Sequence, residues 1–314
     1  MKEFKVSVVI PVYNAVAYVT QAVESALAQP ETAEVLLIED GSPDNALEDC
    51  QALAEKYDKV RLLRHPNGEN RGAGASRNLG MSNAQFDFIA FLDSDDYYLP
   101  GRFAQAMKVF EDHPDCEGVY EAIAMYIEDE EGWQRWQESG KPQESIKTVK
   151  ELINPEELGI ELIRGGNGYF HLNGLVIKKV VLEKSGFMNE DLRVHQDTDF
   201  MVRAALTARL YPGSIDKPIA MWRVHDANRI SAPRSLSVQF RDRMKYWMSL
   251  YRWSKENAGK DVQELIRMST IMYVKTHSCF HSFLRKLLPA KLTLLARLLR
   301  LLGYPEIILD GIKK

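Results

Sequence analysis

The chain has 314 residues, of which 45% are hydrophobic, and its formal net charge is -4. This length allows one large domain or two smaller ones with a substantial core, and the charge gives no overall bias towards nucleic acid or an anionic membrane. The cysteines Cys50, Cys116 and Cys279 are odd in number and widely spaced, which indicates neither a disulfide framework nor a zinc site. No signal peptide precedes the first apolar run and no apolar run is long enough to span a membrane, so we expect a cytoplasmic protein.

The first part of the chain alternates between apolar runs and segments with helical spacing. Short apolar runs predict buried strands at residues 6–10, 35–38, 60–63 and 88–92. Helical spacing of apolar residues occupies 16–27 and 47–57, and a Gly- and Asn-rich loop, RHPNGENRGAGASRNLG, leads into a helix near Ala73. This alternation predicts an α/β fold with a doubly wound, mostly parallel sheet, in which ligands bind at the carboxyl ends of the strands.

The pattern is weaker after residue 114. We expect a hairpin around Glu128–Gly132, a helix near Pro155–Arg164, and strands over 172–177 and near Ile219–Val224. From Leu236 onwards the spacing predicts helices only. The weakly patterned segment is interpreted as the part that faces the substrate.

The stretch FLDSDDYY, residues 91–98, ends an apolar run abruptly in acidic side chains. Asp93, Asp95 and Asp96 follow the predicted strand, so we expect them at the lip of the sheet, where they would repel one another unless a cation holds them. Carboxylate oxygens at such a position suit Mg²⁺ or Mn²⁺, which keep coordination positions open for substrate phosphates. The alternative is a polar turn that caps the next helix, because Asp is a favourable N-cap residue.

The motifs PVYN, EDGS, RGAGASRNLG, LDSDD and QDTDF follow one another along the chain. In this order they resemble the family 2 glycosyltransferases, inverting enzymes of the GT-A fold, and the resemblance covers residues 5–231. It implies a nucleotide-sugar donor, in particular a UDP-sugar, a Mn²⁺ or Mg²⁺ cofactor, and an acceptor hydroxyl on a cell-envelope glycan or lipid-linked molecule. It divides the chain into a GT-A domain, 1–234, with a nucleotide-binding half (1–114) and an acceptor-binding half (115–234), followed by a C-terminal helical region, 235–314.

The resemblance assigns the nucleotide-sugar site to several of these loops. It places Pro11, Val12, Tyr13 and Asn14 under the nucleotide, Asp40 on the uracil ring, Arg77 near the diphosphate, and Asp93 and Ser94 at the ribose. Glu39 stands where the family usually has Asp, a change we expect to be tolerated. The alternatives are a turn residue for Asp40 and a solvated helix arginine for Arg77.

The same resemblance assigns the metal and the catalytic base. Asp95 is expected to bind the cation directly with support from Asp96, and His225, in an Arg-x-His pattern with Arg223, is expected to contact the metal or the diphosphate. In HQDTDF, Asp197 is the expected base, and Gln196 replaces the Glu that is usual in the family. Asp199 is its competitor, with a helix N-cap role for whichever is not catalytic. The residues His171 and Asn173 are candidates for recognition of the sugar or the acceptor.

Residues 282–302 form a basic, leucine-rich stretch divided by Pro289. It could lie in a membrane interface on the inner face, beside a lipid-linked acceptor, or pack on the preceding helices or on the second subunit of a homodimer. The motifs also bear on three other classes of protein. A nucleotidyltransferase would need a Gly-rich loop after the first strand, and an Asp-x-Asp-x-Thr phosphatase would need its acids there, whereas Gln196 and Glu39 keep a non-catalytic glycan-binding scaffold as the remaining alternative.

Overall fold

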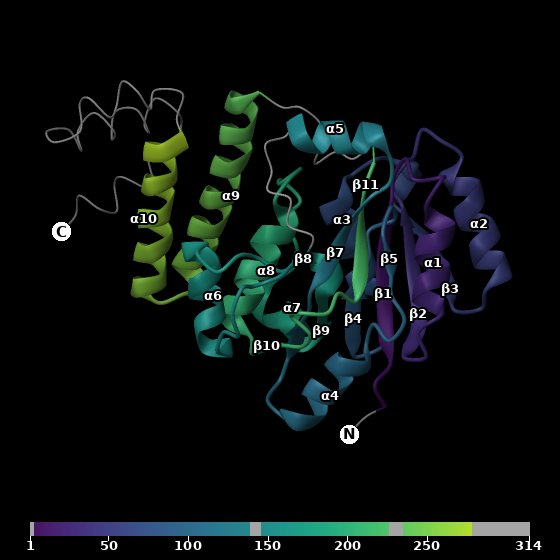
Figure 1. The fold of residues 1–314 in the computed structure, drawn as a ribbon, viewed down its shortest axis with the longest axis horizontal. Coiled ribbons are helices and arrows are strands. Elements are labelled where there is room, and N and C mark those ends of the chain that lie inside the picture. Colours follow the sequence, from purple (N-terminus) through teal and green to yellow (C-terminus); the bar gives the residue numbers. More distant parts are fainter. Residues whose placement is uncertain (1–2, 139–145, 226–234, 278–314) are drawn as a thin grey trace, which may run out of the picture. The chain divides into compact units, whose positions relative to one another are not determined.

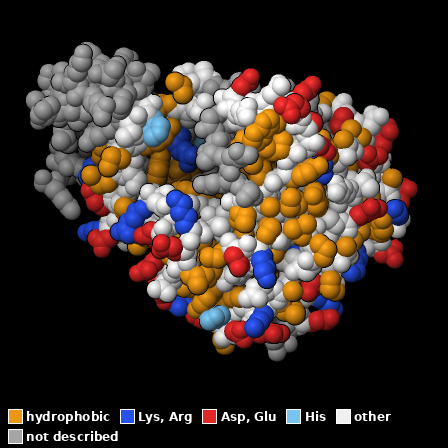
Figure 2. All heavy atoms as spheres, in the orientation of Figure 1, with side chains coloured by type: hydrophobic (Ala, Val, Ile, Leu, Met, Phe, Trp, Pro, Cys, Tyr) orange, Lys and Arg blue, Asp and Glu red, His pale blue; other side chains and the backbone are white. Residues whose placement is uncertain are grey.

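A computed structural model describes residues 3–138, 146–225 and 235–277 (Figure 1). The chain divides into two compact units, residues 1–233 and residues 234–314. On the face shown in Figure 2, acidic and basic side chains are interspersed, in agreement with the small net charge of the sequence.

The first unit is built on a mostly parallel sheet of seven strands in the order β10-β6-β9-β4-β1-β2-β3. Its strands are β1 (Val6–Val12), β2 (Thr32–Glu39), β3 (Val60–Arg64), β4 (Phe88–Phe91), β6 (Gly118–Tyr120), β9 (Leu175–Lys178) and β10 (Leu210–Pro212). The predicted strands of the first hundred residues are therefore confirmed. Among the strands of this sheet, β9 runs antiparallel to both of its neighbours, β4 and β6.

Helices cover both faces of this sheet, as its sequence pattern requires. Every residue of β1 is buried, which is typical of a strand with packing on both sides. The residues Val6, Val8 and Ile10 share a core cluster with the helices α1 (Val19–Leu27), α2 (Ala46–Lys56) and α4 (Ala104–Asp112). On the other face, α3 (Ala73–Asn83) packs so closely that a Cβ atom on Gly80 would lie 2.5 Å from Val9 Cγ1.

A second, four-stranded sheet has the order β5-β11-β7-β8. It consists of β5 (Tyr97–Tyr98), β7 (Ile123–Ile127), β8 (Ile146–Lys147) and β11 (Ala220–Val224). The strand predicted near Ile219–Val224 is confirmed, but it pairs with β7 and β5 rather than with the large sheet. The hairpin expected around Glu128–Gly132 is wrong, because the chain forms the helix α5 (Glu130–Glu138) there and buries Trp136 against Trp222.

The remaining helices of the first unit are α6 (Pro155–Arg164), α7 (Val180–Ser185) and α8 (Gln196–Thr207). The prediction for α6 is confirmed, since Pro155 begins the helix and Gly165 ends it in the left-handed conformation.

The strand expected over 172–177 begins later than predicted. A 3₁₀ turn (Leu172–Gly174) precedes β9, because Gly174 lies against the backbone of Glu121, where a Cβ atom would be 2.2 Å from a carbonyl oxygen.

The second unit contains α9 (Leu236–Asn257) and α10 (Lys260–His277), in agreement with the helices expected after Leu236. Met244 and Val274 form its buried core, and the rings of Phe240 and Tyr273 stack with centroids 5.7 Å apart. Within the described ranges, no helix is long and apolar enough to cross a membrane. The basic stretch 282–302 lies outside the described residues.

Candidate active site

The loops that the sequence singled out meet at the carboxyl edge of the parallel strands. At the end of β1, Pro11 and Val12 are buried, and Val12 O accepts a hydrogen bond from Asp40 N at 2.9 Å. Beyond them, Tyr13 is 51% exposed, and Asn14 adopts a left-handed conformation and donates its N–H to Ser42 Oγ. The end of β1 thus joins the turn after β2 and leaves Tyr13 as an open aromatic side chain at this edge.

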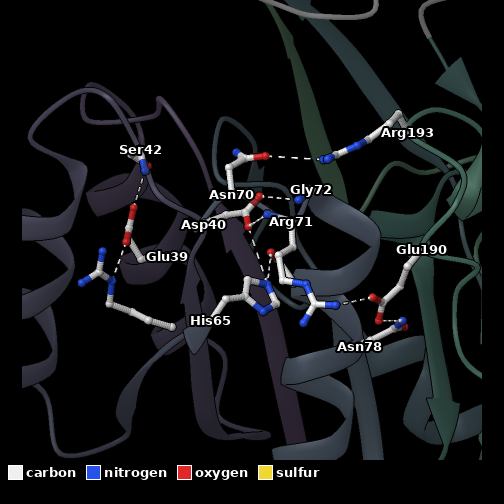
Figure 3. Close-up of polar contacts among 12 residues, drawn as sticks. Glu39, Asp40, Ser42, His65, Asn70, Arg71, Gly72, Asn78, Glu190 and Arg193 are labelled. Atoms are coloured by element: carbon white, nitrogen blue, oxygen red, sulfur yellow. Dashed lines mark hydrogen bonds and ion pairs between the residues drawn. The ribbon is translucent and has the colours of Figure 1, made fainter. Parts of the chain in front are cut away.

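The Asp40 carboxylate is buried and holds the Gly-rich loop (Figure 3). Its Oδ1 accepts the Arg71 N–H and its Oδ2 accepts the Gly72 N–H, both at 2.8 Å. Both carboxylate oxygens therefore accept a hydrogen bond from the loop backbone, and the expected bond from Asp40 to a uracil ring stays a prediction. Asp40 is also more than a turn residue, since it connects two strand-end loops.

The turn after β2 is stabilised separately by Glu39. Its Oε1 accepts the Ser42 N–H at 2.6 Å, and its Oε2 accepts a hydrogen bond from Arg64 Nε at 2.7 Å (Figure 3). The side chain of Glu39 is buried, and Gly41 adopts a φ of +68° beside it, a conformation that favours glycine. The longer Glu side chain at this position thus serves the turn and leaves Asp40 to the loop.

The acidic turn after β4 is held in place from within the protein. Asp93 N donates to Asn173 Oδ1 at 3.1 Å, and Asn173 Nδ2 donates to Asp96 Oδ2 at 2.5 Å. The other oxygen of Asp96 accepts the Arg223 N–H at 2.8 Å, and Ser94 is buried within the same turn. Burial raises the pKa of Asp96 well above its ordinary value, and repulsion from Asp95 and Asp93 acts in the same direction.

The geometry of Asn173 corrects its expected role. The side chain is completely buried, and both ends of its amide are bonded to the acidic turn. It therefore stabilises the turn and is not available to recognise a sugar or an acceptor. It is one of the residues through which the region before β9 supports the loop after β4.

Asp95 and His225 lie side by side at the mouth of the site. The distance between His225 Nε2 and Asp95 Oδ2 is 3.3 Å, and the Asp95 side chain is 30% exposed. Neighbouring ligands of an octahedral cation with bonds of about 2.1 Å are about 3 Å apart, so this pair fits two positions on one ion. The described part of the chain contains no group of three or more His, Cys, Asp and Glu side chains arranged for a metal.

Arg223 does not face a substrate, because its guanidinium group is used within the protein. Its Nε donates to Asp95 O at 3.0 Å, and its two Nη atoms donate to Glu128 and Gln21. The group also lies over the rings of Tyr18, Tyr97 and Tyr126, at 4.7 to 5.9 Å from their centroids. The arginine of the Arg-x-His pattern therefore braces the backbone of the metal-site candidate Asp95.

Arg77 projects from α3 towards the acidic turn and forms an ion pair with Asp93. The residue is only 5% exposed, which excludes the alternative of a solvated helix arginine. Its Nε and Nη1 atoms are buried and have no hydrogen-bond partner among the residues that the structure describes. Since a buried guanidinium group with open donors is costly, these atoms are suited to an anionic ligand in this site.

His171 lies among the charged groups of the site. Its Nδ1 accepts the Asn173 N–H at 3.2 Å, and its ring stacks on Trp222. Burial lowers the pKa of His171, while the nearby carboxylates of Asp93 and Asp197 oppose this shift. A neutral ring with Nδ1 as acceptor carries its proton on Nε2 and can act there as a hydrogen-bond donor.

Both candidates for the base lie in the first turn of α8, but their surroundings differ. Asp199 is completely buried and forms an ion pair with Arg203 at 2.8 Å, so it supports the helix and is not accessible to a substrate. Asp197 is half-buried, and its Oδ1 accepts the N–H of the adjacent Thr198. The N-cap role expected for one of these acids is wrong, because His195, with a φ of +66°, occupies that position. Gln196 is buried against α3, with its Cγ 3.2 Å from the position of a Cβ atom on Gly74.

Several supporting residues were not found from the sequence. Arg102 and Glu121 form a completely buried ion pair at 2.8 Å, and Arg102 also donates to Asn173 O. On α3, Asn78 bonds both backbone groups of Met188. These contacts join positions more than 15 residues apart, which a local pattern does not reveal. For Arg102 and Glu121, the one available signal was a charged residue within an apolar stretch of sequence.

Comparison with known proteins gives a consistent result. The sequence matches the model of Glycosyl transferase family 2 over residues 7–172, which is more than half of the chain. The succinoglycan biosynthesis protein ExoU of Rhizobium meliloti is 28% identical over 209 residues, which cover 66% of this chain and 58% of ExoU. The chain covers between 18% and 68% of the lengths of the first curated relatives that it matches.

Solved structures show the same fold at low sequence identity. S. aureus TarS, in complex with UDP-GlcNAc, matches with a TM-score of 0.62 and 19% identity over 92% of this chain and 76% of that chain. The mannosyltransferase PcManGT from Pyrobaculum calidifontis, in complex with GDP-Man and Mn²⁺, matches with a TM-score of 0.55 and 15% identity over 99% of this chain and 86% of that chain. The predicted GT-A fold is thereby confirmed, and with the family match the chain belongs to the family 2 glycosyltransferases.

Proposed function

We propose that the protein transfers a sugar from a nucleotide sugar, in particular a UDP-sugar, to a hydroxyl group of a polysaccharide or lipid-linked acceptor of the cell envelope. The observation that carries the proposal is the Asp95–His225 pair at the carboxyl edge of the sheet, beside the buried donors of Arg77. A cation site next to a guanidinium group that has two donor atoms without a partner among the described residues is suited to a diphosphate. The nucleotide sugars bound by TarS and PcManGT support this class of donor, and the name of ExoU supports a polysaccharide product.

The donor would lie along the strand ends, with its nucleotide at Tyr13 and the loop held by Asp40. Asp95 and His225 would hold Mn²⁺ or Mg²⁺, and when bound the cation supplies positive charge beside the leaving nucleoside diphosphate. Arg77 would donate to a phosphate oxygen through Nε and Nη1, while its ion pair with Asp93 keeps the guanidinium group in place. The neutral His171 can donate through Nε2 to a hydroxyl group or a phosphate oxygen in the same space.

Asp197 is proposed as the base that removes the proton of the acceptor hydroxyl. The ion pair of Asp199 with Arg203 leaves Asp197 as the accessible carboxylate at the start of α8. The deprotonated hydroxyl oxygen attacks the anomeric carbon from the side opposite the diphosphate, which leaves with the electron pair of the bond that breaks. A single displacement of this kind inverts the configuration of the anomeric carbon.

The metal-site proposal is tested with Asp95→Ala and with Asp58→Ala as the control, because Asp58 is an exposed residue outside the site. A panel of nucleotide sugars is first screened for hydrolysis in the presence of Mn²⁺. We expect Asp95→Ala to abolish hydrolysis and transfer of the preferred donor, and Asp58→Ala to match the wild type. Wild-type transfer by Asp95→Ala, or the absence of any hydrolysis and of metal-dependent UDP binding by the wild type in calorimetry, would contradict the proposal and favour a scaffold.

The base is tested separately, because its loss should spare nucleotide binding. We expect Asp197→Asn to lower the transfer rate by about 10²- to 10⁴-fold, the usual contribution of general base catalysis, with the Kd for UDP in the presence of Mn²⁺ unchanged. An Asp197→Asn protein with full transfer activity excludes this residue as the base.

A further inference from the structure

The segment between α7 and α8 carries the start of the helix that bears Asp197. It has no regular secondary structure between Ser185 and Gln196, and it ends with His195 in the left-handed conformation. Its position therefore depends on contacts with the rest of the protein. Contacts from α3 and from the Gly-rich loop before α3 hold it (Figure 3), and Arg203 of α8 donates to Phe187 O at 2.8 Å.

Asn78 of α3 fixes this segment at Met188. Asn78 Nδ2 donates to Met188 O at 2.9 Å, and Asn78 Oδ1 accepts the Met188 N–H at 2.9 Å. Two bonds from one planar amide to both backbone groups of a residue restrain its orientation as well as its location. Asn78 Nδ2 also lies 3.0 Å from Glu190 Oε1.

The Gly-rich loop contacts the same segment farther along. Arg71 Nη2 pairs with Glu190 Oε2 at 3.3 Å, and Arg193 Nη1 lies 3.5 Å from Asn70 Oδ1 (Figure 3). Arg193 also fills the space beside Gly72, where a Cβ atom would lie 2.7 Å from its Nη1. The loop that Asp40 holds from one side is thus bonded on the other side to the chain that leads into α8.

We infer that Asn78 is a positioning residue of the transferase: through Met188 it places the start of α8, and with it Asp197, relative to the donor site. The inference rests on the proposed role of Asp197 as the base. Among the described residues, the hydrogen bonds of Asn78 go to the Met188–Glu190 stretch and to its own helix, and none goes to the proposed metal residues or to the acidic turn. Its loss should therefore affect the chemical step and spare the binding of nucleotide.

The test compares Asn78→Ala with Asn83→Ala on the same helix. Within the described part of the chain, the Asn83 side chain bonds Leu79 O of the same helix and no other group, so its replacement controls for effects on the helix. We expect Asn78→Ala to lower kcat for transfer by about 10- to 100-fold, as for a small misplacement of a catalytic group. The KM for the donor and the Kd for UDP with Mn²⁺ should stay within about twofold of the wild type, as expected when only the chemical step is affected. Asn83→Ala should retain wild-type kcat.

Glu190→Gln provides a second variant, because the side chain is 44% exposed and its replacement leaves the Asn78 bonds to Met188 in place. It weakens the contacts of Glu190 with Arg71 and with Asn78 Nδ2, so we expect kcat to fall by about two- to fivefold. If Asn78→Ala does not fold, Asn78→Asp takes its place, because it keeps the acceptor for the Met188 N–H and loses the donor to Met188 O. A fall in kcat of Asn78→Asp at constant UDP affinity supports the inference, and a wild-type kcat contradicts it.

Two results for a folded Asn78→Ala protein would overturn the inference: a wild-type kcat, or a fall in kcat that merely follows a loss of UDP affinity. Asp197→Asn is measured in the same series. If Asp197→Asn is inactive while Asn78→Ala has wild-type kcat, the positioning role alone is refuted. If Asp197→Asn is fully active, the proposed base fails, and the positioning role fails with it.

Discussion

The buried ion pair between Arg102 and Glu121 supports the acidic turn from behind. Both side chains are completely buried, Arg102 Nη1 lies 2.8 Å from Glu121 Oε2, and Arg102 Nη2 donates to Asn173 O at 3.1 Å. Because Asn173 in turn bonds Asp93 and Asp96, the pair connects the protein core to the candidate metal site. Removing one partner of the pair should therefore lower the stability of the fold.

We expect Arg102→Ala to lower the free energy of unfolding by about 3 to 5 kcal/mol at pH 7, because it leaves the Glu121 carboxylate buried without a counter-charge. In a unit of this size, this corresponds to a fall in Tm of about 6 to 20 °C. The control is Arg164→Ala, which removes a pair with Glu161 whose side chains are 59% and 22% exposed. That change should cost less than about 1 kcal/mol. Urea denaturation followed by tryptophan fluorescence measures both.

The loss of unfolding free energy caused by Arg102→Ala should also depend on pH, and it should increase as the pH rises. Burial raises the pKa of Glu121, and Arg102 opposes this shift. A carboxyl group with a raised pKa in the folded state contributes stability that is fully present below its ordinary pKa and is lost as the pH rises through the folded value. Removing Arg102 raises this pKa further, so the difference between Arg102→Ala and the wild type should grow from pH 5 to pH 7.5. Adding Glu121→Gln should recover part of the loss at pH 7.5.

Two results would refute this reasoning. One is a loss for Arg102→Ala as small as that for Arg164→Ala, which would mean that the carboxylate of Glu121 gains other compensation. The other is a loss that is independent of pH, which would attribute the whole effect to packing rather than to the buried charge.

Further predictions concern packing, thiol accessibility and the metal site. Gly80→Ala should destabilise the fold by about 1 to 3 kcal/mol in urea denaturation, because its Cβ atom would lie 2.5 Å from Val9 Cγ1. The control is Gly166→Ala, since Gly166 has open space around it. Equal stability of the two variants would contradict the packing argument. Burial raises the pKa values of Cys50 and Cys116 to about 12, so peptide mapping after alkylation at pH 8 should find both unmodified until the protein is unfolded. Arg223→Lys should raise the Mn²⁺ concentration for half-maximal activity by at least about tenfold, because it loses bonds that brace Asp95, and an unchanged Mn²⁺ titration would contradict this.

The regular elements of the first hundred residues could be predicted because each follows a local pattern. Apolar runs such as Val35–Ile38 are buried on both faces. The two ends of α6 follow from Pro155 and Gly165, residue types that favour the start and the end of a helix. The helix α5 was missed because its buried surface comes from a few aromatic residues within a polar sequence, so that Trp136 packs on a distant strand. Propensity could not show a contact that only the tertiary structure creates.

The site was predicted at the level of loops rather than of contacts. The edge of the sheet at which the loops meet follows from the alternation of strands and helices. The partners of individual side chains do not: Asp40 bonds backbone groups of Arg71 and Gly72, and Asn173 is bonded to the acidic turn. These pairings depend on side-chain directions across residues far apart in the sequence, which a single sequence does not contain.

The antiparallel strand β9 has a consequence for how this fold could diversify. Because β6 and β9 are hydrogen-bonded neighbours that run in opposite directions, the chain leaves the sheet after Tyr120 and returns at Leu175 on the same edge. Residues 121–174 thus form an excursion whose two ends are fixed beside each other by the ladder. Its length and sequence can change without altering the pairing of any strand in the large sheet. An exchange of part of this excursion between relatives is therefore a route to a different surface beside the site, provided that Glu121, Asn173, Glu128 and the strand β7, which pairs with β11, are kept.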